Sequence, residues 1–182
     1  MKSAVLPTLA LFIFSMTTQP IAATAQTTVS PAHVSNSFRF VVPAPLNRAA
    51  TLFGPEAERC WAGQHWNPEF LYPQPGRDIQ GAVFTVQHGP HKSIWINTLF
   101  DLANGRLQYV SFIPGVLIFT VDVQLTSINP SATHVDVTYA RTALDALANA
   151  EVQALGERDR ESGPDWQKAI QACLSEQSQN GH

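Results

Sequence analysis

Charged side chains are scarce in this chain of 182 residues. Asp, Glu, Lys and Arg make up 14% of it, against about a quarter in an ordinary soluble domain. The formal net charge is −3, and no block of Lys or Arg occurs. Binding to nucleic acid needs a basic surface that meets the phosphates, so we expect no nucleic-acid partner. Apolar residues make up 45% of the chain, which indicates either a large core or an internal cavity.

The chain also lacks a hydrophobic run long enough to cross a membrane, which takes about 20 residues. The apolar stretch 4–16 is shorter and contains Pro7. Lys2 precedes it, and the small residues of Ala23-Thr24-Ala25 follow, which is the pattern of a cleavable signal peptide over residues 1–25. We therefore predict a periplasmic or secreted protein, cut near Ala25, with no stable membrane anchor.

Cysteine is limited to Cys60 and Cys173. In an exported chain, two cysteines favour a disulfide over a metal site or a catalytic thiol, and a buried pair of free thiols is the alternative. His88 and His91 flank a turn, but no further ligands complete a zinc site. A G-x-S-x-G nucleophile motif is absent as well. We expect neither a metal nor a cofactor.

Turn residues divide the rest of the chain. Residues 26–36 are expected to be a flexible leader, 37–177 one domain and 178–182 a disordered tail. After a first strand at 37–42, two short helical segments begin near Asn47 and Pro55, and a proline-rich stretch at 65–78 reads as a loop. Five strands joined by short turns then predict an antiparallel meander: 82–88, 93–101, 107–113, 116–127 and 133–142.

Side-chain alternation in the last two of these strands predicts one apolar face and one polar face. Asp122, His134 and Asp136 fall on the polar, outer face. The C-terminal part shows helical spacing of apolar residues, interrupted at Gly163-Pro164. We expect this helical segment to cover the apolar face of the sheet.

Short segments spread over residues 37–175 have a familiar form: FRFVVPAP (38–45), ERCWA (58–62), WNPEF (66–70), GAVFT (81–85), Trp95, Asp101 and YARTAL (139–144). With the order of the elements, they resemble the SRPBCC superfamily, which includes START, Bet v 1 and polyketide cyclase-type domains. The resemblance implies an α+β helix-grip fold. In this fold a curled antiparallel sheet wraps around a long C-terminal helix, and two short helices follow strand 1.

That resemblance also implies a deep, largely apolar cavity between the sheet and the C-terminal helix. The two short helices would support the C-terminal end of the long helix, which places Cys60 near Cys173. The candidate ligand-binding residues are Trp95, Tyr109, Phe119, Val137, Tyr139, Arg141 and Val152. At the rim of the cavity we expect His65, Trp66 and Glu69.

Arg141 is the most informative of these residues. It follows Tyr139 on the inner face, so its guanidinium must be paired, meet an anionic ligand group or reach water at the end of the strand. No set of catalytic residues is assigned from the resemblance.

Three functions remain open from the sequence. The leading hypothesis is an exported, monomeric binding protein for a hydrophobic or amphipathic small molecule that is lipid-like or aromatic. The alternative is a cofactor-free cyclase, dehydratase or hydrolase, which requires at least two of Tyr139, Arg141, His65 and Glu69 to share one pocket. An interaction module would instead have a filled core and an exposed apolar patch.

Overall fold

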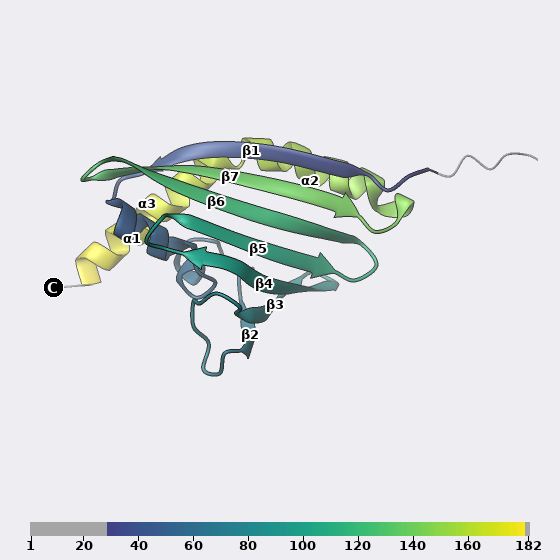
Figure 1. The fold of residues 1–182 in the computed structure, drawn as a ribbon, viewed down its shortest axis with the longest axis horizontal. Helices are drawn as coiled ribbons and strands as arrows, with labels where there is room; N and C mark the ends of the chain where they lie inside the picture. Colours follow the sequence, from purple (N-terminus) through teal and green to yellow (C-terminus); the bar gives the residue numbers. More distant parts are fainter. Residues whose placement is uncertain (1–28, 181–182) are drawn as a thin grey trace, which may run out of the picture.

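Seven antiparallel strands form one curled sheet in the computed structural model, which describes residues 29–180 (Figure 1). The spatial order is β1-β7-β6-β5-β4-β3-β2. The strands are β1 (His33–Val42), β2 (Glu69–Tyr72), β3 (Val83–His88), β4 (His91–Asp101), β5 (Arg106–Ile113), β6 (Leu117–Asn129) and β7 (Ala132–Ala143). The helices are α1 (Leu46–Ala50), η1 (Thr51–Phe53), η2 (Ala57–Cys60), η3 (Ala146–Ala148), α2 (Asn149–Glu161) and α3 (Gly163–Asn180). This is the predicted α+β helix-grip fold.

Tight turns make β3 to β7 a meander, as their sequence predicts. Gly105 in the β4–β5 turn has a φ of 63°. A Cβ on this residue would lie 2.6 Å from the Leu125 carbonyl oxygen. Only glycine adopts this conformation at such a close approach without strain. All five strands of the predicted meander are present, and their boundaries lie within two residues of those expected.

Alternation along the strands separates an inner face from an outer face. In β6 the inward residues Leu117, Phe119, Val121, Val123 and Leu125 are buried, while the residues between them are half-buried or exposed. The outer face is less polar than predicted. Its β4, β5 and β6 strands place Ile94 beside Phe112 and Phe112 beside Ile118, each more than a third exposed.

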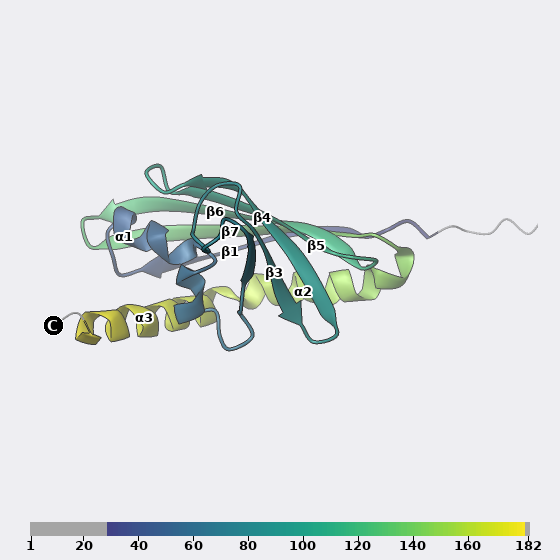
Figure 2. The ribbon, with the colours of Figure 1, turned by 90° about the horizontal axis from the view of Figure 1, so that it is seen from below.

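The helices α2 and α3 follow each other along the inner side of the sheet (Figure 2). Helix α2 contacts β1 and β7, and α3 contacts β1. The two helices meet at Ser162 and Gly163, which confirms the predicted interruption. The apolar spacing is not buried at its start, where Leu144 is 41% and Leu147 95% exposed, and both residues lie before α2 begins.

Three boundaries differ from the sequence prediction. Strand β1 begins at His33, so residues 33–36 of the predicted leader pair with β7. Strand β2 lies within the stretch predicted as a loop, and it pairs with β3. Helix α3 continues to Asn180, so residues 178–180 of the predicted tail are helical. In the two strand cases, backbone pairing with a longer neighbour outweighs weak local propensity.

The predicted signal peptide lies outside the described residues. Within residues 29–180, no helix is long and apolar enough to span a membrane.

A disulfide joins Cys60, at the end of η2, to Cys173 in α3. The two Cα atoms are 5.6 Å apart, and 113 positions separate the residues in the sequence. The pairing that the family resemblance implied is therefore present. It fixes the short helices after β1 to the C-terminal helix.

Removing this disulfide should lower the free energy of unfolding by about 4–5 kcal/mol, because a long loop is no longer closed in the unfolded chain. The change is Cys60→Ser with Cys173→Ala, measured by urea unfolding. Reducing agent should lower the stability of the wild type to a similar extent and leave the double variant unchanged. A loss below about 1 kcal/mol would contradict a structural role for the bond.

Candidate functional site

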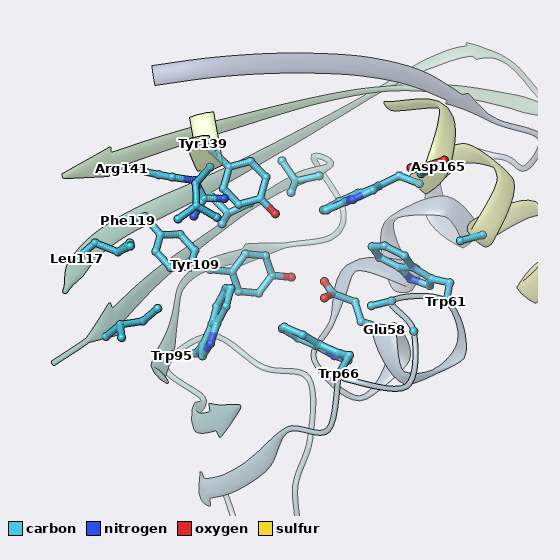
Figure 3. A pocket seen from close by; sticks show the side chains of 18 of the residues that line it. Glu58, Trp61, Trp66, Trp95, Tyr109, Leu117, Phe119, Tyr139, Arg141 and Asp165 are labelled. Carbon is cyan, nitrogen blue, oxygen red and sulfur yellow. The ribbon is translucent and has the colours of Figure 1, made fainter. Parts of the chain in front are cut away.

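A cavity of about 570 Å³ lies between the inner face of the sheet and the helices (Figure 3). Strands β4 to β7 form one wall, and η2 with the segment after it forms another. Helices α2 and α3 close the remaining side. The lining residues are Glu58, Trp61, Ala62, Gly63, Trp66, His91, Trp95, Tyr109, Ile113, Leu117, Phe119, Val121, Val123, Tyr139, Arg141, Glu151, Leu155, Asp165, Trp166 and Ala169.

Aromatic rings form a continuous surface around this cavity. All four tryptophans of the chain line it, and Tyr109, Phe119 and Tyr139 join them. The ring centroids of Trp61 and Trp166 are 4.9 Å apart, and those of Trp66 and Trp95 are 5.4 Å apart. Such close edge and tilted contacts stabilise a rigid aromatic wall.

The polar edges of three of these indoles are already occupied. The Trp61 Nε1–H donates to the Leu52 carbonyl at 2.7 Å, and the Trp66 Nε1–H donates to the Pro55 carbonyl at 2.9 Å. The Trp95 Nε1–H donates to the Ser93 hydroxyl at 2.7 Å. Because these donors have protein partners, the three rings offer the cavity mainly apolar surface.

Arg141 on β7 forms a buried ion pair with another side chain instead of reaching water. Its Nε and Nη2 donate to the two carboxylate oxygens of Asp159 in α2, each at 2.7 Å. The guanidinium also lies over the rings of Phe119 and Tyr139, 4.6 and 4.4 Å from their centroids. Of the three outcomes left open by the sequence, pairing is the one observed. The pair adds no net charge to the cavity wall.

Glu58 supplies the buried carboxyl of the site. It lies on η2 with 8% of its surface exposed, and its side chain points into the cavity (Figure 3). No side chain among residues 29–180 donates a hydrogen bond to this carboxyl. Burial raises the pKa of Glu58 well above its ordinary value of 4.5, and the nearby charge of Asp78 raises it further.

Two tyrosine hydroxyls face the same space as Glu58 (Figure 3). The Tyr109 hydroxyl is buried and has no hydrogen-bond partner among the described residues. The pKa of Tyr109 is raised well above 10, mainly by burial and to a smaller extent by the charge of Glu58. Burial also raises the pKa of Tyr139, against a smaller lowering effect of Arg141. An unpartnered buried hydroxyl is costly, so a ligand atom that bonds it would bind favourably.

Asp78 orients the helical turn that carries Glu58. Its carboxylate accepts hydrogen bonds from the backbone N–H groups of Glu56 at 2.8 Å and Ala57 at 3.1 Å. A Cβ at Gly54 would lie 2.2 Å from the Asp78 carboxyl carbon. Glycine at this position therefore allows Asp78 to reach the start of η2.

Six of the predicted site residues line the cavity: Trp66, Trp95, Tyr109, Phe119, Tyr139 and Arg141. Val137 and Val152 do not, although both are fully buried. Their side chains pack within the core, so the strand and helix periodicities identified the correct face but not which residues reach the cavity. His65 and Glu69 are exposed and do not line the cavity, and Glu69 forms an ion pair with Lys92 at 2.9 Å.

The sequence prediction missed Glu58 and His91. Glu58 lies between Glu56 and Arg59 in the sequence, so no local pattern distinguishes it as a buried carboxyl. His91 is exposed beside the turn, as expected, but it also begins β4 and borders the cavity. His134 and Asp136 lie on the outer face, as predicted, and the His134 Nδ1 is 3.5 Å from the Asp136 Oδ2. Within residues 29–180, no group of three or more His, Cys, Asp or Glu could hold a metal ion.

The sequence matches no protein-family model, and no curated protein matches it. Solved structures are similar. Norcoclaurine synthase from Thalictrum flavum aligns with a TM-score of 0.58 and 12% identity, over 93% of this chain and 99% of that one. An uncharacterized protein from Rhizobium leguminosarum aligns with a TM-score of 0.54 and 16% identity, over 78% of this chain and 97% of that one.

A second norcoclaurine synthase structure from the same plant contains dopamine and hydroxybenzaldehyde. It aligns with a TM-score of 0.58 and 13% identity, over 87% of this chain and 98% of that one. At these identities the similarity concerns the fold. The chain therefore shares with these structures the helix-grip fold, in which a curled antiparallel sheet wraps around a long C-terminal helix.

Breaking the buried ion pair should be costly. Arg141→Met leaves the Asp159 carboxylate buried without its partner, and we expect a loss of about 3–5 kcal/mol in the free energy of unfolding. The double variant Arg141→Met with Asp159→Leu should recover most of this loss, as measured by urea unfolding. Equal losses in the single and double variants would show that packing, rather than charge pairing, is what Arg141 provides.

The raised pKa of Glu58 predicts a pH-dependent stability. The folded carboxyl holds its proton more tightly than the unfolded one, so Glu58 lowers stability as pH rises from about 4.5 toward its folded pKa. Glu58→Gln removes this effect. Between about pH 4 and about pH 8, urea unfolding should show the wild type losing stability relative to the variant.

Glu176→Gln is the control for this measurement, because Glu176 is exposed on α3. Its unfolding curve should follow that of the wild type across the same pH range. If the wild type and Glu58→Gln give parallel curves, the folded pKa of Glu58 is not raised.

Proposed function

We propose that this protein is exported and binds an aromatic or otherwise apolar small molecule in the cavity. The observation that supports this best is the aromatic wall around about 570 Å³, with three indole donors already satisfied by the protein. Ligand cavities typically enclose about 300–1,000 Å³ and combine apolar walls with a few polar groups. Here the polar groups include Glu58, Tyr109 and Tyr139.

The energetics favour an apolar body for this ligand. Each Å² of apolar surface removed from water contributes about 25 cal/mol, and the rings of Trp66, Trp95 and Phe119 offer such surface. The norcoclaurine synthase structure with dopamine and hydroxybenzaldehyde supports an aromatic ligand by analogy of fold. The signal-peptide pattern of residues 1–25 supports export, and a disulfide suits an oxidising compartment.

Acid–base catalysis is the second candidate, supported by the juxtaposition of Glu58 with the Tyr109 hydroxyl. A buried carboxyl whose pKa is raised is able to give and take protons near neutral pH. Tyr139 and Arg141 share the cavity, but His65 and Glu69 lie outside it. A role as an interaction module is less well supported, because a cavity of this size differs from the filled core that it requires.

The binding test uses the neutral aromatic dye N-phenyl-1-naphthylamine, which fluoresces in apolar sites. The protein should bind it, and Ala169→Phe should weaken binding at least about tenfold by filling the cavity. Ala172→Phe places the same ring on the exposed side of α3 and should leave binding unchanged. Equal dye binding in both variants, or none in the wild type, would contradict the proposal.

The same preparation tests export and distinguishes binding from catalysis. Expressed with its N-terminus in a bacterium, the protein should appear in the periplasm with the mass of residues 26–182. Native mass spectrometry should show a co-purifying small molecule that is lost in Ala169→Phe. A ligand that is recovered unchanged after prolonged incubation supports binding, whereas its conversion supports the enzyme.

A further inference from the structure

The charges around the cavity are of one sign. Three carboxyl groups line it, those of Glu58, Glu151 and Asp165. The one guanidinium in the lining belongs to Arg141, and Asp159 neutralises it. Among residues 29–180, no lysine contributes to the lining, and His91 is its one imidazole. The electrostatic field inside the cavity therefore favours a positive charge over a negative one.

Glu58 is the carboxyl best placed to meet such a charge. It is more than nine-tenths buried, whereas Glu151 and Asp165 are exposed on the helices. The side chains drawn nearest to it in the cavity are Tyr109 and the indoles of Trp61 and Trp66 (Figure 3). Aromatic faces attract organic cations, and the attraction strengthens where water is excluded.

The Tyr109 hydroxyl is an independent indication of a missing ligand atom. It is buried, lacks a partner among the described residues and faces the Glu58 carboxyl. Its oxygen can accept a hydrogen bond from an ammonium N–H. Since the three indole donors are engaged elsewhere, this corner of the cavity offers mainly acceptors and π faces.

Building on the proposed function, we propose that the ligand is an organic ammonium with an aromatic or apolar body, and that Glu58 is its counter-ion. The body would contact the ring faces of Trp95 and Phe119. The ammonium would lie between Glu58, Tyr109 and the indole of Trp61 or Trp66. An anionic ligand would instead find no counter-ion here, because the one guanidinium among the described lining residues is already paired with Asp159.

Proton release should accompany binding. A cation next to Glu58 stabilises the ionised carboxylate, so the pKa of Glu58 falls on binding and affinity rises with pH. The titratable and charged groups around Glu58 are Asp78 before β3, His91 on β4, Tyr109 on β5, Tyr139 and Arg141 on β7, Glu151 on α2 and Asp165 on α3. Of these, His91 is the one imidazole, so the contribution of Glu58 must be separated from that of His91.

The test compares three probes that share one naphthalene ring. They are cationic 2-naphthylmethylammonium, neutral 2-naphthalenemethanol and anionic 2-naphthylacetate, measured by isothermal titration calorimetry. In the wild type the cation should bind at least about tenfold more tightly than the neutral probe, and the anion least tightly. Glu58→Gln should reduce the preference for the cation over the neutral probe to below about threefold.

Glu176→Gln is the matched control, because it changes the net charge equally on an exposed part of α3. It should retain the full preference for the cation. Between about pH 5 and about pH 8, cation affinity should rise more in the wild type than in Glu58→Gln, and the variant measures what His91 contributes. Titrations in buffers of different ionisation enthalpy should show proton release that depends on Glu58.

The outcomes are distinct. Tight binding of the neutral probe without a preference for the cation would overturn this inference and leave the proposed function standing. A preference that survives in Glu58→Gln would also overturn it. No binding of any probe, together with no binding of N-phenyl-1-naphthylamine, would overturn the proposed function and this inference with it.

Discussion

The bond between Cys60 and Cys173 links the two elements that close one end of the cavity. Helix η2 provides Glu58 and the following Trp61, while α3 provides Trp166 and Ala169. Because these walls belong to elements far apart in the chain, their separation depends on a link between them. The disulfide supplies that link covalently. Next to it, the rings of Trp61 and Trp166 pack together and join the same two elements at the cavity wall. The position of the buried carboxyl relative to the long helix follows from this constraint.

The pair formed by Arg141 and Asp159 joins β7 to α2 on another side of the cavity. A buried charge needs a partner to be tolerated, so this pair also fixes where the helix can lie. Between the disulfide and this ion pair, the helices cover the inner face of the sheet but leave a cavity beneath them. Rings held by contacts with one another leave open space that flexible aliphatic side chains would tend to fill.

Local sequence predicted most of the fold. Glycine, proline and asparagine separated the strands, and the alternation in β6 and β7 gave the inner face, including Tyr139 and Arg141. The missed β2 strand depends on pairing with β3 rather than on its own residues. The site was predicted less completely. Alternation cannot distinguish Val137 in the packed core from Tyr139 at the cavity, and the burial of Glu58 arises from contacts between distant segments that no local pattern encodes.

The gathering of every tryptophan of the chain around one cavity has an optical consequence. The near-ultraviolet emission of the whole protein comes from indoles that all border the same space. The two pairs, with centroids 4.9 and 5.4 Å apart and planes inclined at 57° and 85°, are close enough for their electronic transitions to couple. The circular dichroism and fluorescence of the native protein are thus set largely by this single chamber, so an occupant should change both spectra without any attached label.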